Sequence, residues 1–345
     1  MTIFRRYLRQ RLESSALRTL IMTAIAVLIT HLAVTDGILY TEAKYNQTNL
    51  YVLATILCVL SSIVPMLELS DLKKRRSLDT FFSMPIGRGK LALTHWVSGW
   101  LQVWFVYSVA YLWSSVILHT QTDYFDLSHL LPYYFISLLL GTVIYSFFLF
   151  LFGEGNTALD GFFFCVLGIF VFTFIFAFGC QIIHMIEKNT AREIEFFMDP
   201  EWGILYAPIN NLTVIFQRMI HVNQKLTSSV STYYDRLLSD FGLYFAFWIV
   251  IGVLSTVGYF VRFQRIRAEQ IEDISNSWFG YRTMIPIYGY TALLYTGMDD
   301  FLGLYILIAM LAVYILYRRS FRIKKSDVFV LLLSIIPILA YSAFG

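Results

Sequence analysis

Residues 127–153, LSHLLPYYFISLLLGTVIYSFFLFLFG, contain no Asp, Glu, Lys or Arg over 27 residues. An α-helix rises about 1.5 Å per residue, so about 20 apolar residues cross the ~30 Å hydrocarbon core of a bilayer. A segment of this length and composition therefore predicts a transmembrane helix.

Eight further stretches of 16 or more residues lack all four charged residue types. They are residues 19–35, 45–67, 91–122, 161–186, 241–261, 283–298, 301–317 and 328–345. The chain of 345 residues is 58% hydrophobic and only 14% charged, whereas soluble proteins have about 25% charged residues. The sequence therefore predicts an all-α polytopic membrane protein with about nine transmembrane helices.

The basic residues predict which side of the membrane each loop faces. Positively charged loops are retained in the cytoplasm. With the N-terminus inside and nine spans, 20 of the 26 Lys and Arg residues fall on the inner side. This retention explains the basic clusters, so nucleic-acid binding is not expected.

Two segments outside the spans carry amphipathic patterns. Residues 1–17 alternate apolar and basic side chains, which favours an interfacial amphipathic helix over a merely basic flank. Residues 187–240 form the long outer segment, which is too short and mixed for an independent core and is expected to contain short helices that return to the interface.

The inner connection at residues 69–90 carries charged residues followed by Phe81 and Phe82. Pro85 ends any helix before it, so a short helix over residues 77–83 is expected. Exposed aromatic side chains beside charges are typical of a protein docking site. The alternative is that both rings enter the membrane interface.

Motifs for catalysis are missing from the sequence. It contains no G-x-x-x-x-G-K-[ST] phosphate loop, no H-E-x-x-H and no G-x-S-x-G. Cys58, Cys165 and Cys180 all lie in apolar stretches without metal-ligand spacing, so no metal site is expected. His31 is the ionisable candidate within the first span, with a neutral, hydrogen-bonded imidazole as the alternative. Mid-membrane acidic residues are absent from the spans, which disfavours a proton-driven carrier.

Aromatic side chains are concentrated in two of the predicted spans. Phe163, Phe170 and Phe174 lie in residues 161–186, and Trp96, Trp100 and Trp104 follow each other at intervals of four, which predicts stacking on one helix face. These rings are expected either to pack against helices and lipid or to line a path for an amphipathic substrate.

Residues 79–91, DTFFSMPIGRGKL, resemble the loop between the second and third spans of ABC-2-type transporter permeases from Gram-positive bacteria. In that family an aspartate and aromatic-rich positions precede a Ser-Leu-Pro-Ile core and a basic residue. Met84 replaces the usual Leu, and Phe82 replaces a frequent His. Residues 262–269 and 317–325 resemble further inner segments of the family.

The resemblance implies a six-span permease core at residues 18–264 and three additional spans at 265–345. It implies no cofactor on this chain, because ATP and Mg would bind a separate ABC ATPase subunit. Residues 69–90 would form a coupling helix that docks into that subunit. The implied coupling residues are Asp79, Phe81, Phe82, Ser83, Pro85, Arg88 and Lys90, with Glu154 and Asp160 at a second contact. A second permease subunit, identical or different, would complete a path that includes Phe163, Phe170, Phe174 and His31.

These features together predict the membrane subunit of an ATP-driven ABC exporter in the plasma membrane, with no enzymatic activity of its own. Its expected substrate is amphipathic, such as an antimicrobial or toxin-like peptide, a lipid-like compound or a drug. The alternative is a non-transporting antibiotic-sensing or resistance membrane subunit, in which residues 187–240 capture the antibiotic.

Overall fold

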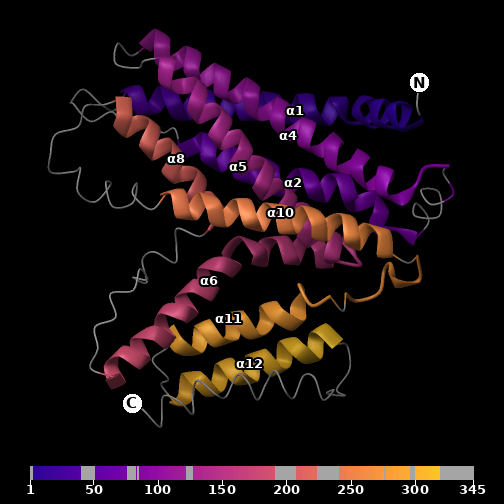
Figure 1. Ribbon diagram of the computed structural model, residues 1–345, viewed down its shortest axis with the longest axis vertical. Helices are drawn as coiled ribbons and strands as arrows, with labels where there is room; N and C mark the ends of the chain where they lie inside the picture. The colour runs from indigo at the N-terminus through magenta and orange to yellow at the C-terminus, as the bar shows by residue number, and fades with distance from the viewer. Residues whose placement is uncertain are drawn as a thin grey trace. The chain divides into compact units, whose positions relative to one another are not determined.

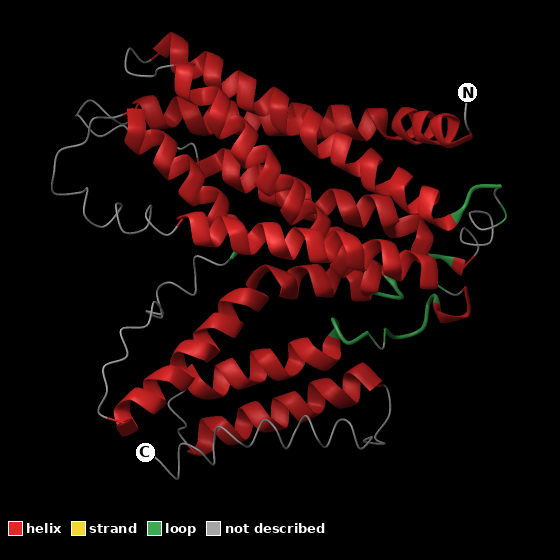
Figure 2. Ribbon diagram, viewed as in Figure 1, coloured by secondary structure: helices red, strands yellow, loops and turns green. Residues whose placement is uncertain are grey.

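The computed structural model describes residues 3–39, 51–75, 83, 85–121, 127–190, 207–223, 241–266, 268–275, 277–295 and 300–318. Within these ranges the regular elements are all helices, and no strand occurs among them (Figures 1 and 2). The all-helical architecture predicted from the apolar stretches is therefore confirmed for the described part of the chain.

Six of the described helices are long and apolar enough to cross a membrane. They are α1 (Ile3–Leu39), α2 (Tyr51–Leu69), α4 (Arg88–Gln121), α5 (Leu127–Glu154), α6 (Ala158–Thr190) and α10 (Phe241–Arg265). They coincide with the first six predicted stretches, as a multi-pass membrane protein requires.

The remaining predicted stretches have different outcomes. The seventh and eighth contain the helices α11 (Tyr281–Tyr295) and α12 (Asp300–Arg318). Helix α11 has only 15 residues, which at about 1.5 Å each is shorter than the hydrocarbon core. The ninth stretch, residues 328–345, lies outside the described residues.

The chain divides into two compact units. The first unit covers Met1–Gly153 and Pro208–Ile271, and the second covers Glu154–Ala207 and Glu272–Gly345. Helix α6 therefore belongs with α11 and α12, whereas α10 belongs with α1, α2, α4, α5 and α8. The six-span core implied by the resemblance thus draws its helices from both units.

In the first unit, α1 packs along α4, and α4 also packs against α2 (Figure 1). Helix α10 approaches α5 closely at glycines: an added Cβ at Gly258 would lie 2.8 Å from Cε2 of Phe150. A Cβ at Gly252 would lie 2.6 Å from Cγ1 of Val143. Since both distances are shorter than van der Waals contact, this helix pair depends on the absence of a side chain at these positions.

Residues 187–240, predicted as the long outer segment, contribute one described helix, α8 (Pro208–Asn223), which packs against α2. Leu212, Ile215 and Phe216 are buried on this helix. An amphipathic helix with its apolar side covered fits the prediction of short helices in residues 187–240, although the rest of that segment lies outside the described residues.

Helix α1 is one uninterrupted helix of 37 residues that contains both the predicted first span and residues 3–17. Many of its apolar side chains are exposed in the single chain, including Leu20, Leu28 and Leu32. An apolar face of this kind is compatible with lipid or with a partner helix.

In the second unit, the start of α6 is fixed by a capping interaction. The backbone N–H of Asp160 donates to Oγ1 of Thr157 at 3.0 Å. Thr157-Ala158-Leu159-Asp160 is thus a Thr-x-x-Asp N-terminus, in which the Thr hydroxyl satisfies one of the free amides of the first turn.

Candidate functional site

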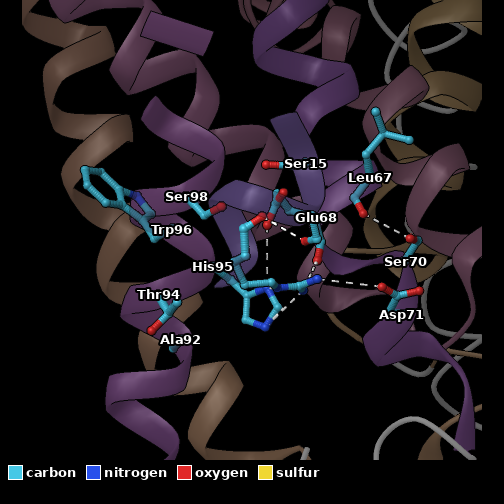
Figure 3. A network of polar contacts seen from close by, with 12 residues as sticks. Ser15, Leu67, Glu68, Ser70, Asp71, Ala92, Thr94, His95, Trp96 and Ser98 are labelled. Atoms are coloured by element: carbon cyan, nitrogen blue, oxygen red, sulfur yellow. Dashed lines mark hydrogen bonds and ion pairs between the residues drawn. The ribbon is translucent and has the colours of Figure 1, made fainter. Parts of the chain in front are cut away.

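A cluster of buried charged and polar side chains joins α1, α2 and α4 in the first unit. Its centre is Glu68, near the end of α2, whose side chain is only 2% exposed. Figure 3 shows Glu68, His95 and Asp71 pointing toward one another from α2, α4 and the 3-10 turn after α2. A buried carboxylate needs a counter-charge and hydrogen-bond donors, and its neighbours supply both.

Arg18 and Gln102 bind one oxygen of this carboxylate. Nη2 of Arg18 forms an ion pair with Oε1 of Glu68, and Nε2 of Gln102 donates to the same oxygen at 2.8 Å. The guanidinium also donates to Oε1 of Gln102 at 2.7 Å. Each of the three side chains therefore contacts the other two, and one of the three comes from each helix.

Arg11, about two helical turns before Arg18 in α1, holds the other side of the cluster. Its Nη2 donates to the backbone oxygen of Glu68 at 3.2 Å and lies 2.8 Å from Nδ1 of His95. Nε2 of His95 also lies 3.4 Å from the same Nη2, and a guanidinium only donates, so the unprotonated nitrogen of the imidazole is the acceptor. Nη1 of Arg11 lies 3.7 Å from Oδ2 of Asp71.

Gly99 allows the helices to come together at this point. An added Cβ at Gly99 would lie 3.0 Å from Cγ of Glu68 and would also overlap the Tyr145 hydroxyl. Tyr145 donates its hydroxyl proton to the backbone oxygen of Trp96 at 3.1 Å. Any side chain at residue 99 would therefore push α2 or α5 away from α4.

The chemistry available to this cluster is that of a structural connection. Two guanidinium groups balance two carboxylates, so the cluster attracts neither an anion nor a cation. Among the described residues, no group of three or more His, Cys, Asp and Glu is placed to hold a metal ion. A network of this type fixes the relative positions of helices, because each broken bond would leave a buried charge without a partner.

A second set of polar contacts involves the connection between α2 and α4. Nζ of Lys73 donates to the backbone oxygen of Gly153 at 3.1 Å, and Nε of Arg75 donates to that of Ile271 at 2.8 Å. Nη1 of Arg88 donates to the backbone oxygens of Gln264 and Ile266, at 3.0 and 3.2 Å. We call Lys73, Arg75 and Arg88 the basic clasp.

The predicted coupling residues of this connection are only partly described. Asp79, Phe81 and Phe82 lie outside the described residues. Ser83, Pro85, Arg88 and Lys90 are all exposed. The expected docking surface therefore has its basic and turn residues accessible, with Arg88 also bonded to the end of α10.

Glu154 and Asp160, predicted at a second partner contact, are buried in the second unit, each 7% exposed. Oε2 of Glu154 accepts a hydrogen bond from the Ser277 hydroxyl. Oδ2 of Asp160 accepts one from the backbone N–H of Ser275 at 3.1 Å, and Oδ1 accepts one from the Tyr281 hydroxyl at 3.0 Å. Contact of a partner with either carboxylate would require these bonds to open.

Tyr281 is the link between this carboxylate pair and the aromatic packing of the second unit. Its ring centroid lies 4.9 Å from that of Phe164 and 4.6 Å from that of Tyr317. Burial of the phenol, together with the nearby Asp160 carboxylate, raises the pKa of Tyr281 well above its ordinary value. The hydroxyl therefore stays protonated and remains a donor to Asp160 throughout the physiological range.

The predicted substrate-path residues lie in both units. On α6, Phe163 and Phe170 are 43% and 50% exposed, while Phe174 packs against the Tyr288 ring at 4.5 Å between centroids. His31 on α1 is exposed, with its ring centroid 6.0 Å from that of Trp113. Two of the three phenylalanines are thus available to lipid or substrate.

The predicted stacking of the three tryptophans on α4 is confirmed. Trp100 lies 6.1 Å from Trp96 and 6.0 Å from Trp104 between ring centroids, with interplanar angles of 8° and 5°. Each indole Nε1 donates to a side-chain oxygen of α5. Trp96 donates to Ser146 Oγ, Trp100 to Thr142 Oγ1 and Trp104 to Tyr134 OH. The tryptophans therefore connect α4 to α5, which favours packing over a substrate path for these rings.

Comparison with family models and curated proteins does not assign a role to this site. No protein-family model matches the chain, and no curated protein matches its sequence. The assignment of function therefore depends on the geometry described above and on the sequence resemblance of the α2–α4 connection.

Sequence reasoning missed the Glu68 cluster, although a signal for it was present. Glu68 follows an apolar span, and a carboxylate at that position needs a basic partner at the same depth. Arg18 precedes the first apolar stretch and Gln102 interrupts the third, so both were candidates. The basic clasp carried no such signal, because its acceptors are backbone carbonyls.

Proposed function

We propose that this chain is the membrane subunit of an ATP-driven ABC exporter, with its ATPase on a separate subunit. One observation carries the proposal. The connection that resembles an ABC-2 coupling loop is hydrogen-bonded to the ends of α5 and α10. A protein that binds this connection can therefore act on several apolar helices at once.

The proposed topology has nine spans with the N-terminus inside the cell. The Glu68 cluster supports an inner membrane boundary at the level of Arg18, Glu68 and Gln102. Arg11–His95 and Arg18–Gln102 both join residues 84 apart, so α1 and α4 run parallel in one register. Outward of this level, residues 18–39, 51–68 and 102–121 extend about 32, 26 and 29 Å, close to the ~30 Å hydrocarbon thickness.

Cysteine labelling tests this boundary. Leu93 and Leu112 are both exposed on α4, and Leu93 lies about 14 Å inward of Gln102 by helix rise. In a background without native cysteines, Leu93→Cys should react with a membrane-impermeant maleimide in inside-out vesicles, and Leu112→Cys should not. Protection of both would place the boundary near residue 91, and labelling of Leu93→Cys only from outside would reverse the orientation.

The proposed partner is an ABC ATPase subunit that binds ATP and Mg. Phe81 and Phe82 would enter an apolar pocket of that subunit, while Arg88 and Lys90 would face acidic residues at its rim. Purification with the co-encoded ATPase tests this assignment. Replacing both phenylalanines by Asp should abolish assembly and transport-coupled hydrolysis, and the coupling assignment fails if both survive.

The proposed substrate is amphipathic, such as an antimicrobial or toxin-like peptide, a lipid-like compound or a drug. Exposed Phe163 and Phe170 support this class, because aromatic rings at a membrane surface suit a partly apolar molecule. A second permease subunit would complete the path in the plasma membrane. Phe170→Ala should then lower drug or peptide export without loss of the ATPase, which a purely lipid-facing ring would not do.

A further inference from the structure

The basic clasp holds the ends of two helices that are distant from it in sequence. Lys73 reaches a carbonyl 80 residues away, in the last turn of α5. Arg88 reaches a carbonyl 176 residues away, in the last turn of α10. Since Lys73 follows α2 and Arg88 begins α4, the inner ends of four helices are joined through one connection.

The bonds of the clasp are of a kind that resists separation. The last four carbonyls of a helix have no partner within the helix, and the helix dipole places partial negative charge there. A cation that donates to such a carbonyl makes a charge-assisted bond, roughly twice as strong as a neutral one. Helices usually obtain such caps from nearby residues, whereas here a different segment supplies them.

Burial strengthens the Lys73 contact in particular. The whole residue is 5% exposed, and its Nζ lies 5.5 Å from the centroid of the Phe152 ring. The hydrogen bond to the Gly153 carbonyl offsets part of the free-energy cost of burying this ammonium charge. A small pocket beside it is lined mainly by apolar residues, among them Leu69, Leu72 and Phe263, together with Arg262. Lys73 is therefore held in place rather than free to rotate into water.

We propose that the basic clasp transmits movement of the α2–α4 connection to α5 and α10. The inference rests on the proposed function, in which an ATPase subunit binds and displaces that connection. Lys73 carries the displacement to α5, and Arg88 carries it to α10. Lys73 lies outside the proposed ATPase-binding residues, so its loss separates ATP hydrolysis from movement of α5. Arg88 also belongs to the proposed ATPase contact, so its effect on α10 is compared with α5 in the same complex.

Hydrogen exchange of the complete complex tests the clasp. The full chain is purified with its co-encoded ATPase, with and without trapping by ATP and orthovanadate. The variants are Lys73→Met and, separately, Arg88→Met, each of which keeps the side-chain bulk but removes one donor. Lys74→Met is the matched control, because Lys74 is a neighbouring lysine that is 71% exposed and pairs locally with Asp71.

In the wild type and the Lys74→Met control, we expect trapping to change amide exchange at the ends of both α5 and α10. In Lys73→Met the ATPase should still co-purify, and the change at α5 should fall by about threefold or more relative to the change at α10. An unchanged ratio of the α5 response to the α10 response in Lys73→Met overturns the inference. If the wild type binds no ATPase, the proposed function itself is refuted.

Arg88→Met covers the case in which Lys73→Met fails to assemble. Arg88 is exposed, so Arg88→Met is expected to fold normally. Because Arg88 also belongs to the proposed ATPase contact, the response of α10 is read relative to that of α5 in the same complexes. This ratio should fall, because Lys73 still holds Gly153. A response of both helices equal to that of the wild type would show that the clasp does not transmit movement.

Discussion

Replacing Glu68 by Gln tests whether the buried cluster holds α1, α2 and α4 together. Glutamine has nearly the same shape as glutamate but carries no charge. The substitution therefore leaves the Arg18 guanidinium beside α2 without its counter-charge, while the contact with Gln102 can persist. The loss is thus that of the ion pair and not of the packing.

The expected loss of unfolding free energy follows from how deeply Glu68 and Arg18 are buried. Removing one partner of a buried ion pair costs about 3–5 kcal/mol. The Arg18 side chain is 31% exposed, so water takes up part of the uncompensated charge, and we expect Glu68→Gln to cost about 2–3 kcal/mol. In a chain of this size, that corresponds to a decrease of about 5 °C or more in the unfolding midpoint.

The control is an ion pair of the same chemistry at the surface. Glu13 pairs with Arg9 at 2.8 Å, and their side chains are 63% and 73% exposed. Glu13→Gln should cost about 0–0.5 kcal/mol, because exposed pairs contribute little. Thermal unfolding in one detergent, followed by tryptophan fluorescence, compares the two variants directly. Equal shifts for Glu68→Gln and Glu13→Gln would refute the assigned role of the cluster.

A double-mutant cycle then separates the pair from its surroundings. Arg18→Gln combined with Glu68→Gln leaves no unpaired charge, so the double variant should be more stable than the sum of the single changes predicts. Strict additivity would mean that the two side chains do not interact in the folded protein.

Three further substitutions test contacts within one unit or the other by the same unfolding assay. Gly258→Ala should destabilise the protein by about 1–3 kcal/mol through overlap with the Phe150 ring, whereas Gly242→Ala, with open space around it, should not; equal effects would contradict the packing argument. Trp100→Phe removes the indole donor to α5 and should cost about 1 kcal/mol, and no change would mean that this bond is not formed in the membrane. Tyr281→Phe leaves a buried carboxylate oxygen of α6 without its donor and should cost about 1–3 kcal/mol, unless that oxygen is already satisfied by water.

The apolar helices could be predicted from the sequence because each depends on local composition alone. A stretch of about 20 uncharged residues in lipid must satisfy its backbone hydrogen bonds internally, so it forms a helix whatever its neighbours are. The stacking of Trp96, Trp100 and Trp104 was predictable for a similar reason, since residues four apart lie on the same helix face.

The candidate site depended on information that local sequence does not contain. Glu68 meets Arg18 across 50 residues and Gln102 across 34, and these meetings require a particular register between α1, α2 and α4. Gly99 permits that register, but a glycine in a helix does not by itself indicate which helix will approach it. The partners of Lys73 and Arg88 could not be predicted either. Retention of basic loops on one side of the membrane already explained the charge of both residues.

By itself, the sequence determined that this is a helical membrane protein and where six of its apolar helices run, because lipid imposes that outcome on each segment separately. Only the tertiary structure decided that Glu68 and the basic clasp connect α1, α2, α4, α5 and α10 at one end. The physical reason is that a buried charge is stable only beside its partner, and the partner's distance is set by how helices pack, not by how residues follow one another.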